Sequence, residues 1–568
     1  MEVESPVLAQ LLWNRNIRTK EDIGAFLHPD WETGIHRPSD FLHMSAAVNR
    51  VFDALENKER ITVHGDYDAD GVTGSAVVIA TIREIERLLA RDTRYSILDT
   101  RIDFYIPHRD KEGYGLHRDT IPKLTERGTG LIITVDCGIA CVDEIALAKQ
   151  SGMDVIVIDH HQFGETLPDG HLIHPGLPEE IYPFKKLAAV GVAFKFACAF
   201  LDEARRRGYA VPEGWEKWLL DLVAIATVTD MVPLIGENRV LQTYGLRVLN
   251  KTRRIGLQAL IRSADIKPGT LDATSVGFGL GPRLNAAGRM DHAEIALRLL
   301  LAATREEADA LAADIERCNR ERQEATRRML DEAERKIDQA GSPDGKIFVF
   351  SDERWSPSLV GLVAGKFLER FGKPAIAIGR CENTWIGSGR SYDYYDITDA
   401  VRTVGDGLLA RVGGHVQACG FTLLGSEHIP LLQERLFAHA QEHIRDEDLV
   451  PTIQIETEIP LDDADWPLAT MLEKMEPFGQ GNPRPIFISR RCPVLSSDAI
   501  GPTHNHMRLT LRKSNGNWIK AIGFKQGERA KEVVPGTMVD CVYTVTINEW
   551  NGKKNVECRI IDVRPTAD

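Results

Sequence analysis

The chain has 568 residues, of which 43% are hydrophobic and 27% charged, and its net charge is −14. At roughly 150 residues per domain this length predicts three or four domains, and the ordinary composition excludes a disordered or fibrous protein. The apolar runs are shorter than the roughly 18 residues of a membrane helix, and the acidic start differs from a signal peptide. We therefore expect a cytoplasmic protein with no membrane contact. Since the net charge is negative, any nucleic-acid contact requires a local basic stripe.

The nine cysteines include no C-x-x-C pair, and the closest two are Cys137 and Cys141. This pattern fits neither a disulfide framework nor a zinc ribbon, so we expect reduced thiols. The phosphate-binding segment G-x-x-x-x-G-K-[ST] is also missing from the sequence. Nucleotide-driven unwinding is therefore not expected.

The first predicted region has an alternating strand and helix pattern. Short apolar segments at 61–65, 131–136 and 155–161 are separated by helical patterns such as 74–90. This rhythm predicts a mostly parallel sheet with helices on its faces. Asp and His residues follow the strands, and ligands of open α/β sheets bind at the carboxyl ends of strands. These polar residues are expected to meet at one edge of the sheet.

A long charged helix is expected over 304–340, because apolar residues recur there at helical spacing without Pro or Gly. Strands at 347–350 and 374–379 begin a second α/β region. Beyond about residue 445 the pattern changes to short strands with turns at Asn515-Gly516 and Asn551-Gly552, which predicts an OB-like β-barrel. The expected parts are an N-terminal lead-in segment (1–57), an α/β catalytic domain (58–303), a connector helix (304–340), a second α/β domain (341–445) and an OB-fold nucleic-acid-binding domain (446–568).

The densest chemical signal is the segment HGDYDADG at 64–71, which places three carboxylates, Asp66, Asp68 and Asp70, at alternate positions after a strand. Like charges this close raise one another's pKa unless a cation neutralises them. The rival interpretation is a calcium loop of the EF-hand type. That loop requires Glu at its twelfth position, which is Val77 here.

Two further strand ends carry similar residues. Asp136 follows the second strand and Asp159-His160-His161 follows the third. Taken alone, Asp136 is as readily a helix cap, and a His pair is more often a polar loop. Three successive strand ends with Asp or His favour a metal site instead, and mixed imidazole and carboxylate ligands suit manganese, zinc or iron better than magnesium alone.

The segments HGDYDADG, TVDCG, IDHH and DLVAIATVTDMVPLIGENR together resemble the four motifs of the DHH phosphoesterase superfamily. The resemblance implies a hydrolase with two ions, Mn²⁺ or Mg²⁺. It assigns one ion to His64, Asp68 and Asp136, and the other to Asp70, Asp136, His160 and Asp221. Asp136 would bridge the ions, and Asp230 is the alternative to Asp221. The catalytic residues implied are Asp136 and His161, and His161 would either support a metal ligand or contact phosphate.

Segments at 105–116, 187–195, 281–290 and 319–323 resemble the single-strand-specific DNA exonucleases of this superfamily. Three residues are expected to contact the substrate backbone: Arg283, Asn285 and Arg289. The alternative is that these residues form surface salt bridges and a helix cap. Glycine-rich segments farther along resemble the DHH-associated domain. The substrate-binding residues expected there are Ser388, Arg390, Gly413, Gly414 and His415.

The terminal barrel interleaves cations such as Arg508, Arg512 and Lys520 with Trp518, a combination that suits single-stranded nucleic acid. An ordinary solvated barrel is the alternative.

Two positions depart from the family pattern. Ser356 stands where many relatives have His, and His174 where many have Asn.

The resemblance implies an exonuclease that degrades single-stranded DNA from the 5′ end to mononucleotides in recombination and repair. A RecQ-type helicase and single-strand-binding protein are the implied partners, and we expect a monomer. The alternatives are a phosphodiesterase of dinucleotides or short oligonucleotides, whose members are usually shorter, and an inactive scaffold that has lost its metal ligands. The sequence leaves open the preferred metal, the processivity and the activity on RNA.

Overall fold

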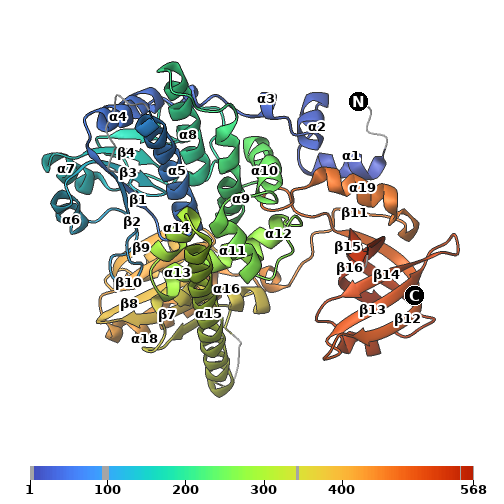
Figure 1. Cartoon of the computed structure of the whole chain (residues 1–568). Helices are drawn as coiled ribbons and strands as arrows, with labels where there is room; N and C mark the ends of the chain where they lie inside the picture. The colour runs from blue at the N-terminus through green and yellow to red at the C-terminus, as the bar shows by residue number, and fades with distance from the viewer. Residues whose placement is uncertain (1–4, 92–100, 341–344, 551, 567–568) are drawn as a thin grey trace. The chain divides into compact units, whose positions relative to one another are not determined.

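The computed structural model describes residues 5–91, 101–340, 345–550 and 552–566. They form two compact units: one comprises Met1–Arg37, Met231–Arg247 and Ile453–Asp568, and the other Pro38–Asp230 and Val248–Thr452. Figure 1 labels the elements of both. Within the described residues no helix has the length and apolarity to cross a membrane. All nine cysteines are free thiols.

The larger unit begins with the predicted parallel sheet, which has the strand order β2-β1-β3-β4-β5. Its strands are β1 (Arg60–Gly65), β2 (Ile102–Tyr105), β3 (Thr129–Val135), β4 (Asp154–Ile158) and β5 (His171–Ile173). The sequence patterns predicted β1, β3 and β4 but missed the short strands β2 and β5 at the two edges.

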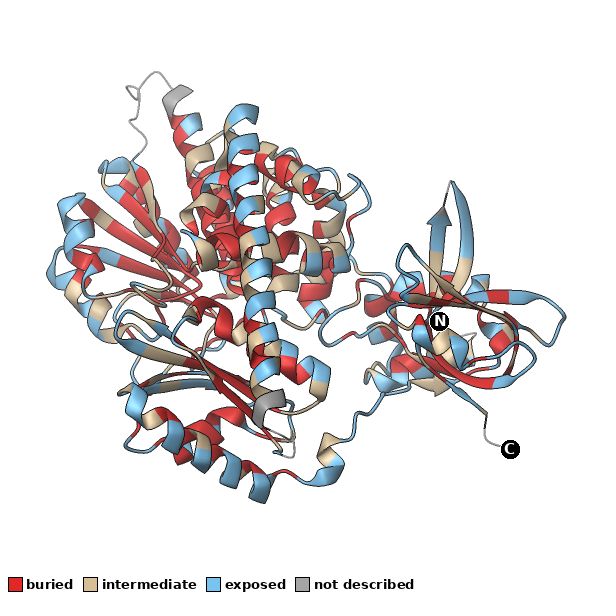
Figure 2. Ribbon diagram, turned by 90° about the horizontal axis from the view of Figure 1, so that it is seen from below, coloured by how far each residue is buried: buried red, intermediate tan, exposed pale blue. Residues whose placement is uncertain are grey.

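Helices cover both faces of this sheet, and the central strands are buried (Figure 2). On one face lie α6 (Thr120–Glu126) and α7 (Val142–Gln150), whose apolar side chains pack on β3 and β4. On the other face lie α4 (Met44–Glu56), α5 (Ala69–Arg91) and α8 (Ala189–Arg206). Burial of both faces explains why the strands appear in the sequence as continuous apolar runs.

The predicted long helix is α15 (Arg305–Ala340). It packs against α11 (Ile255–Ser263), α13 (Gly281–Met290) and α14 (Glu294–Leu301). Buried and exposed residues recur along its described part, as the colours in Figure 2 show.

A second sheet follows α15, in the order β6-β7-β8-β10-β9. Its strands are β6 (Phe348–Ser351), β7 (Ala375–Cys381), β8 (Thr384–Arg390), β9 (Leu409–His415) and β10 (Ala418–Leu423). Helix α16 (Pro357–Phe371) packs on one face, whereas α17 (Ile397–Val404) and α18 (Ile429–His443) pack on the other.

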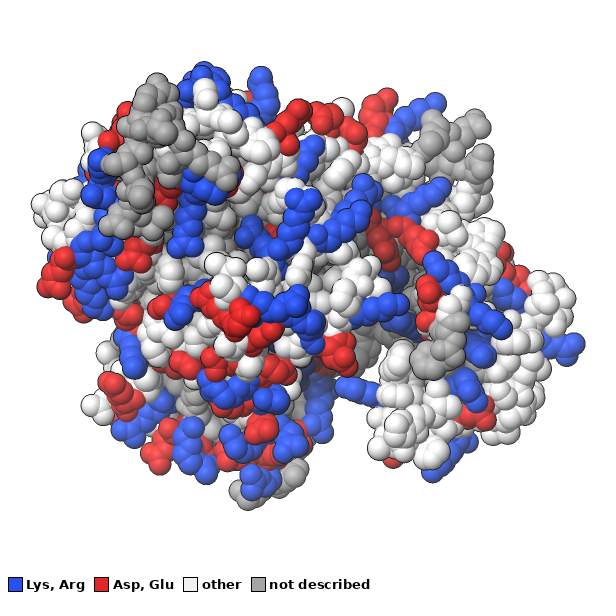
Figure 3. Space-filling view, in the orientation of Figure 1, with Lys and Arg blue, Asp and Glu red and all other residues white. Residues whose placement is uncertain are grey.

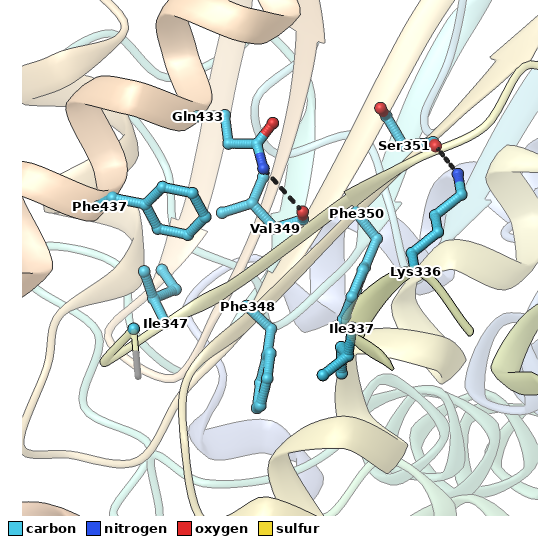
Figure 4. A pocket seen from close by; sticks show the side chains of 10 residues that line it. Lys336, Ile337, Ile347, Phe348, Val349, Phe350, Ser351, Gln433 and Phe437 are labelled. Carbon is cyan, nitrogen blue, oxygen red and sulfur yellow. Dashed lines mark hydrogen bonds between the residues drawn. The ribbon is translucent and has the colours of Figure 1, made fainter. Parts of the chain in front are cut away.

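Edge strand β6 borders an apolar hollow that is lined by residues of α15, β6 and α18 (Figure 4). Two polar side chains close the free edge of the strand. Lys336 donates to the carbonyl of Ser351, and Gln433 Nε2 donates to the carbonyl of Val349 at 3.4 Å. Capped carbonyls reduce the tendency of an edge strand to pair with another chain. The residues that line this hollow include none of the predicted site residues.

The smaller unit contains a barrel with the strand order β11-β12-β13-β14-β16-β15, closed by pairing of β12 with β15. The strands are β11 (Thr457–Glu458), β12 (Phe487–Ile500), β13 (His506–Arg512), β14 (Trp518–Gly523), β15 (Met538–Trp550) and β16 (Lys553–Pro565). Gly516 has φ 86° in the predicted turn between β13 and β14. Of the other predicted turn, Asn551 lies outside the described residues.

The barrel packs with two helices that are distant in sequence, α1 (Pro6–Asn14) and α2 (Lys20–Leu27), and with α19 (Trp466–Met475), which lies between β11 and β12. Arg239, from the segment Met231–Arg247, joins them. Its guanidinium is buried and donates to the carbonyls of Phe26 (2.7 Å), Met475 (3.0 Å) and Glu476 (2.8 Å). Residues 5–37 therefore fold with the barrel, and α4 with the parallel sheet.

Candidate metal centre and phosphate site

The loop after β1 is built so that its carboxylates face the sheet edge. A Cβ on Gly71 would lie 2.6 Å from the backbone of Asp66, so only glycine allows this tight turn. Asp68 Oδ1 accepts from the backbone N–H of Asp70 at 2.9 Å, and Asp70 in turn accepts from Ala189 (2.7 Å) and Val190 (2.8 Å) at the start of α8. Backbone donors thus fix the direction of Asp68 and Asp70.

The next two strands deliver their polar residues to the same edge. Asp136 follows β3 with φ 63°, and its N–H donates to the carbonyl of Ile158 in β4. His160 Nε2 lies 3.2 Å from Asp136 Oδ1 and 3.7 Å from carboxylate oxygens of both Asp70 and Asp230. Three overlapping groups of potential ligand atoms each lie within 4.8 Å: Asp66-Asp68-Asp136, Asp70-His160-Asp230 and Asp136-His160-His161. We call Asp66, Asp68, Asp70, Asp136, Asp230 and His160 the carboxylate cluster.

Several atoms of this cluster are buried without a hydrogen-bond partner among the described residues. They are Asp66 Oδ1, Asp136 Oδ1, His160 Nε2 and Asp230 Oδ2. A buried polar atom without a partner is costly, and metal ligation would satisfy it. Oxygen donors together with an imidazole nitrogen form a donor set that suits divalent manganese and tolerates magnesium. The residues present therefore fit a pair of divalent cations.

The electrostatics of the cluster lead to the same conclusion. Burial, and next the charge of Asp68, raises the pKa of Asp70 to about 7, and burial together with Asp70 and Asp68 raises that of Asp230 to about 9. The pKa of Asp136 is raised well above its ordinary value for the same reasons. Burial lowers the pKa of His160 to about 4, which keeps the imidazole neutral and able to ligate.

The structure corrects the prediction for Asp221. Its carboxylate is buried at the start of α9 (Leu220–Thr229), where it accepts from Thr252 Oγ1 at 2.7 Å and from Arg254 Nε at 3.0 Å. Asp230, at the opposite end of α9, lies beside His160 instead. Asp221 lies in the first turn of α9 and Asp230 follows its last residue, so one motif on one helix supplies both a structural ion pair and a cluster residue.

His64 stays a predicted ligand. Its ring is fully buried and stacks on Tyr105 with a centroid distance of 5.5 Å, and its Nε2 has no hydrogen-bond partner among the described residues, although it is not in any of the three groups of ligand atoms. Asp66, which was not predicted as a ligand, lies in the group with Asp68 and Asp136. The alternate spacing of the three carboxylates in HGDYDADG was the signal that could have identified Asp66.

His161 is held next to the cluster by two neighbours. Its Nδ1 lies 2.9 Å from Asp159 Oδ1 and 3.0 Å from the Tyr114 hydroxyl, which donates to the carbonyl of Asp136 at 3.0 Å. Although burial alone would raise the pKa of Asp159, the hydrogen bond with His161 holds it below its usual value. Burial of His161 is likewise outweighed by Asp159, so the pKa of His161 is raised. Tyr114 was not among the residues predicted from the sequence.

His174, one of the two departures from the family pattern, is buried beside this group. Its Nε2 lies 2.8 Å from the carbonyl of His161, and its Nδ1 accepts from the N–H of Gly176 at 3.0 Å. It therefore supports the backbone of His161. Ser356, the other departure, precedes α16, and its side chain makes no capping hydrogen bond.

Four arginines gather beside the carboxylate cluster, and we call them the arginine cluster: Arg109, Arg289, Arg322 and Arg390. Burial, and next the charges of the other three, lowers the pKa of Arg289 to about 9. Within the described part of the chain, none of the four has a carboxylate within 4.0 Å of its guanidinium. Arg109 lies over the ring of Tyr67 at 4.5 Å, which links the two clusters. Figure 3, by contrast, shows basic and acidic side chains interspersed on one face of the molecule.

The other residues predicted at 281–290 have structural partners. Arg283 donates to Glu316 Oε2 (2.7 Å) and to the carbonyl of Gly279 (2.9 Å), and Asn285 Oδ1 accepts from the N–H of Ala69 (2.7 Å) at the start of α5. These contacts match the alternative of a salt bridge and a helix cap. Arg289 donates to the carbonyl of Ser358 at 2.5 Å, in the first turn of α16.

The predicted residues of the second sheet form two rows across its strands. Ser388 pairs with Gly420, which pairs with Gly413, and Arg390 pairs with Ala418, which pairs with His415. Paired residues point to the same face of a sheet. A Cβ on Gly413 or Gly420 would meet nothing within 4 Å, so the sheet is uncovered at these two glycines, in the rows next to Arg390. Gly414 has φ 148° and packs on the backbone of Ala418.

Comparisons with known proteins agree with these features. Family models match at 60–227 (DHH family, N-terminal domain), 344–442 (DHHA1 domain) and 455–562 (RecJ OB domain). The single-stranded-DNA-specific exonuclease RecJ of Salmonella typhimurium is 32% identical over 99% of this chain and 96% of its own length. The chain belongs to the RecJ family. The Bacillus subtilis RecJ is 37% identical over 98% of the chain and 68% of that protein.

Solved RecJ structures share the fold. RecJ from Thermus thermophilus in complex with Mn²⁺ superposes with a TM-score of 0.81 and 29% identity, covering 99% of this chain and 76% of the other. The complex of the same protein with Mg²⁺ gives a TM-score of 0.74 at 27% identity, covering 99% and 75%. The predicted membership of the DHH superfamily is confirmed. So is the predicted architecture: a parallel-sheet domain, a long helix, a second α/β domain and an OB-like barrel.

Proposed function

We propose that this RecJ-family chain is a metal-dependent exonuclease that hydrolyses single-stranded DNA from the 5′ end and releases mononucleotides, in DNA recombination and repair. The observation that carries the proposal is the pairing of the two clusters. In one cluster, buried carboxylate oxygens have no hydrogen-bond partner among the described residues. In the neighbouring cluster, buried arginines have no carboxylate beside them in the part of the chain that the structure describes. The first arrangement suits divalent cations, and the second suits the phosphates of a polynucleotide. Relatives named single-stranded-DNA-specific exonuclease support the substrate.

The carboxylate cluster would hold two ions, Mn²⁺ or Mg²⁺. We assign Asp66, Asp68 and Asp136 to one ion, because their ligand atoms lie together. We assign Asp70, His160 and Asp230, which form another such group, to the second ion together with Asp136, whose Oδ1 lies 3.2 Å from His160 Nε2. When bound, such ions polarise the phosphodiester and lower the pKa of water. Asp136 would contribute to both sets.

The chain's own groups would then orient the substrate and move the proton. Asp159 and Tyr114 engage His161 Nδ1, which leaves His161 Nε2 to contact a phosphate oxygen or protonate the leaving oxygen. Arg289, Arg390 and Ser388 would bind the terminal phosphate, because a guanidinium offers two parallel donors to it. Their distance from the cluster would set which phosphodiester is cut.

The OB-like barrel would contribute its own contacts to the single strand. On the outward face of β13 and β14, Arg512 pairs with Trp518, which is 57% exposed, and Arg508 pairs with Ile522. Exposed rings and cations side by side suit stacked bases and phosphates. We propose a RecQ-type helicase as a partner, because the sequence has no nucleotide-binding motif that would drive unwinding. Single-strand-binding protein is the second proposed partner, and the proposed state of the enzyme is a cytoplasmic monomer.

The test follows nucleotide release from a 5′-labelled single strand and from its duplex, with Mn²⁺ or with EDTA. We expect metal-dependent release of mononucleotides from the single strand only. Turnover of dinucleotides with no attack on long strands would replace the proposal with a small-substrate phosphodiesterase. A 3′-labelled strand is the control for polarity, since it should lose its label last.

A further inference from the structure

Tyr114 lies in the loop between β2 and α6, and its hydroxyl joins the end of β3 to the segment that follows β4. The hydroxyl donates to the carbonyl of Asp136 at 3.0 Å and lies 3.0 Å from His161 Nδ1. The rings of Tyr114 and His161 also meet edge to face, with centroids 5.4 Å apart. The two flanking residues, Gly113 with φ 84° and Gly115 with φ 95°, let the backbone turn without strain on each side of the tyrosine.

The contacts of Tyr114 determine which nitrogen of His161 carries hydrogen. A hydroxyl has one hydrogen, and the carbonyl of Asp136, which only accepts, takes that of Tyr114. The hydroxyl oxygen is therefore an acceptor toward His161 Nδ1. Asp159 Oδ1, 2.9 Å from the same nitrogen, also accepts, since it receives the backbone N–H groups of His160 (2.7 Å) and His161 (3.2 Å). With two acceptors beside it, Nδ1 carries the hydrogen, and Nε2 is left to face the substrate.

A hydrogen on Nδ1 also keeps His161 out of the metal site. This nitrogen lies 3.6 Å from Asp136 Oδ1, and only a nitrogen with a lone pair can ligate a cation. Asp159 by itself would hold the hydrogen on Nδ1, but a single contact leaves the ring free to tilt about it. Tyr114 adds a second contact from a different loop, so both the hydrogen position and the ring plane are fixed.

We propose that Tyr114 is a positioning residue for phosphodiester hydrolysis, which holds His161 with its hydrogen on Nδ1 and its Nε2 directed at the substrate. This inference rests on the proposed nuclease activity, in which His161 contacts a phosphate oxygen or protonates the leaving oxygen. Tyr114 acts through His161 and not through the ions. Its hydroxyl should therefore contribute to kcat, and contribute little to KM or to Mn²⁺ affinity.

The test is Tyr114→Phe, which removes only the hydroxyl, with Tyr105→Phe as the matched control. The hydroxyl of Tyr105 bonds to Glu112 of the same loop and lies 3.1 Å from Lys123 Nζ, away from His161. At saturating Mn²⁺ we expect Tyr114→Phe to lower kcat on a 5′-labelled single strand roughly 10- to 100-fold, because His161 is misplaced. Tyr105→Phe should keep the wild-type kcat. Equal losses in the two variants would overturn the proposal, since they would indicate a general loosening of the loop.

His161→Ala provides the background that separates positioning from independent support. In this background Tyr114→Phe should cause no further loss of kcat, because its effect passes through the missing imidazole. Losses that multiply in the double variant would overturn the proposal. Weakened Mn²⁺ binding in Tyr114→Phe, with wild-type kcat at saturating Mn²⁺, would also overturn it, because Tyr114 would then support Asp136 instead of His161.

The metal-free protein gives a readout that needs no cleavage. Long-range ¹H–¹⁵N spectra of histidine-labelled protein, recorded where the imidazole is neutral, show which ring nitrogen carries hydrogen, and His161→Ala identifies the signal of His161. We expect hydrogen on Nδ1 in wild type and Tyr105→Phe, and a shifted His161 signal in Tyr114→Phe. Hydrogen on Nε2 in wild type would overturn the proposal. If wild type cleaves dinucleotides but not long strands, the proposed function fails, whereas these spectra and the same kcat comparison on dinucleotides still test Tyr114.

Discussion

The carboxylate cluster and the arginine cluster lie side by side, and each concentrates one sign of charge. In the first, buried oxygens lack partners and the pKa of Asp70 rises to about 7. In the second, the pKa of Arg289 falls to about 9, because the guanidinium is buried and other guanidinium groups surround it. Neither arrangement stabilises the fold by itself, since buried like charges repel. Each is consistent with a ligand of opposite charge, cations in one and phosphate in the other.

The largest expected effect is that of Asp136→Asn, which removes the residue common to both proposed ligand sets. Its φ of 63° suits Asn, which adopts left-handed backbone readily. We expect Mn²⁺-dependent cleavage to fall about a thousandfold or more. The metal-free protein should gain about 1–3 kcal/mol in unfolding free energy, since Asn avoids the cost that the raised pKa of Asp136 imposes on the folded state at neutral pH.

Urea unfolding of both proteins, with EDTA and with Mn²⁺, measures this difference. The gain should vanish in Mn²⁺, which stabilises only the wild type. An Asp136→Asn variant that is less stable than wild type in EDTA would show that Asp136 belongs to a satisfied structural network instead.

The arginine cluster is tested by Arg390→Ala, with Arg283→Ala as the matched control. Arg390 has no carboxylate partner among the described residues, whereas Arg283 is neutralised by Glu316. Loss of a charged hydrogen bond to phosphate should raise KM for 5′-phosphorylated single strands roughly 10- to 100-fold. Arg283→Ala should change KM little. Similar effects of the two substitutions would remove the distinction between the clusters.

The affinity for metal is also expected to depend on pH. The raised pKa values of Asp70 and Asp230, about 7 and about 9, mean that the metal-free site holds protons that cations must displace. Mn²⁺ affinity should therefore increase from pH 6 to pH 8, by about tenfold per pH unit for each proton released. Calorimetry in buffers of different ionisation enthalpy counts these protons. A flat affinity would mean that the carboxylates are already ionised.

The sequence predicted the strands whose ends carry Asp136 and His160, because a buried strand followed by polar residues is a local pattern. It also predicted the three large α/β and β parts and the long helix. The choice between Asp221 and Asp230 could not be made, since both ends of α9 carry Asp and only tertiary contact with Arg254 or His160 separates them. Arg109, Tyr114 and Asp159 were missed as partners for the same reason.

The association of residues 5–37 with the barrel could not be predicted from the sequence either. It depends on Arg239, which reaches carbonyls more than 200 residues away in both directions along the chain. No local pattern signals such a contact. The short edge strands β2 and β5 were missed because three or four residues give too little periodicity to detect.

The most direct test of the two-cluster account compares Asp230→Asn with Asp221→Asn in one experiment, Mn²⁺ binding together with cleavage of a 5′-labelled single strand. Asp230→Asn should fold normally, bind Mn²⁺ weakly and lose cleavage. Asp221→Asn should lose about 3–5 kcal/mol of stability from the broken pair with Arg254, yet cleave when folded and bind Mn²⁺ as wild type does. Full activity in Asp230→Asn, with Mn²⁺ binding lost in folded Asp221→Asn, would contradict the account.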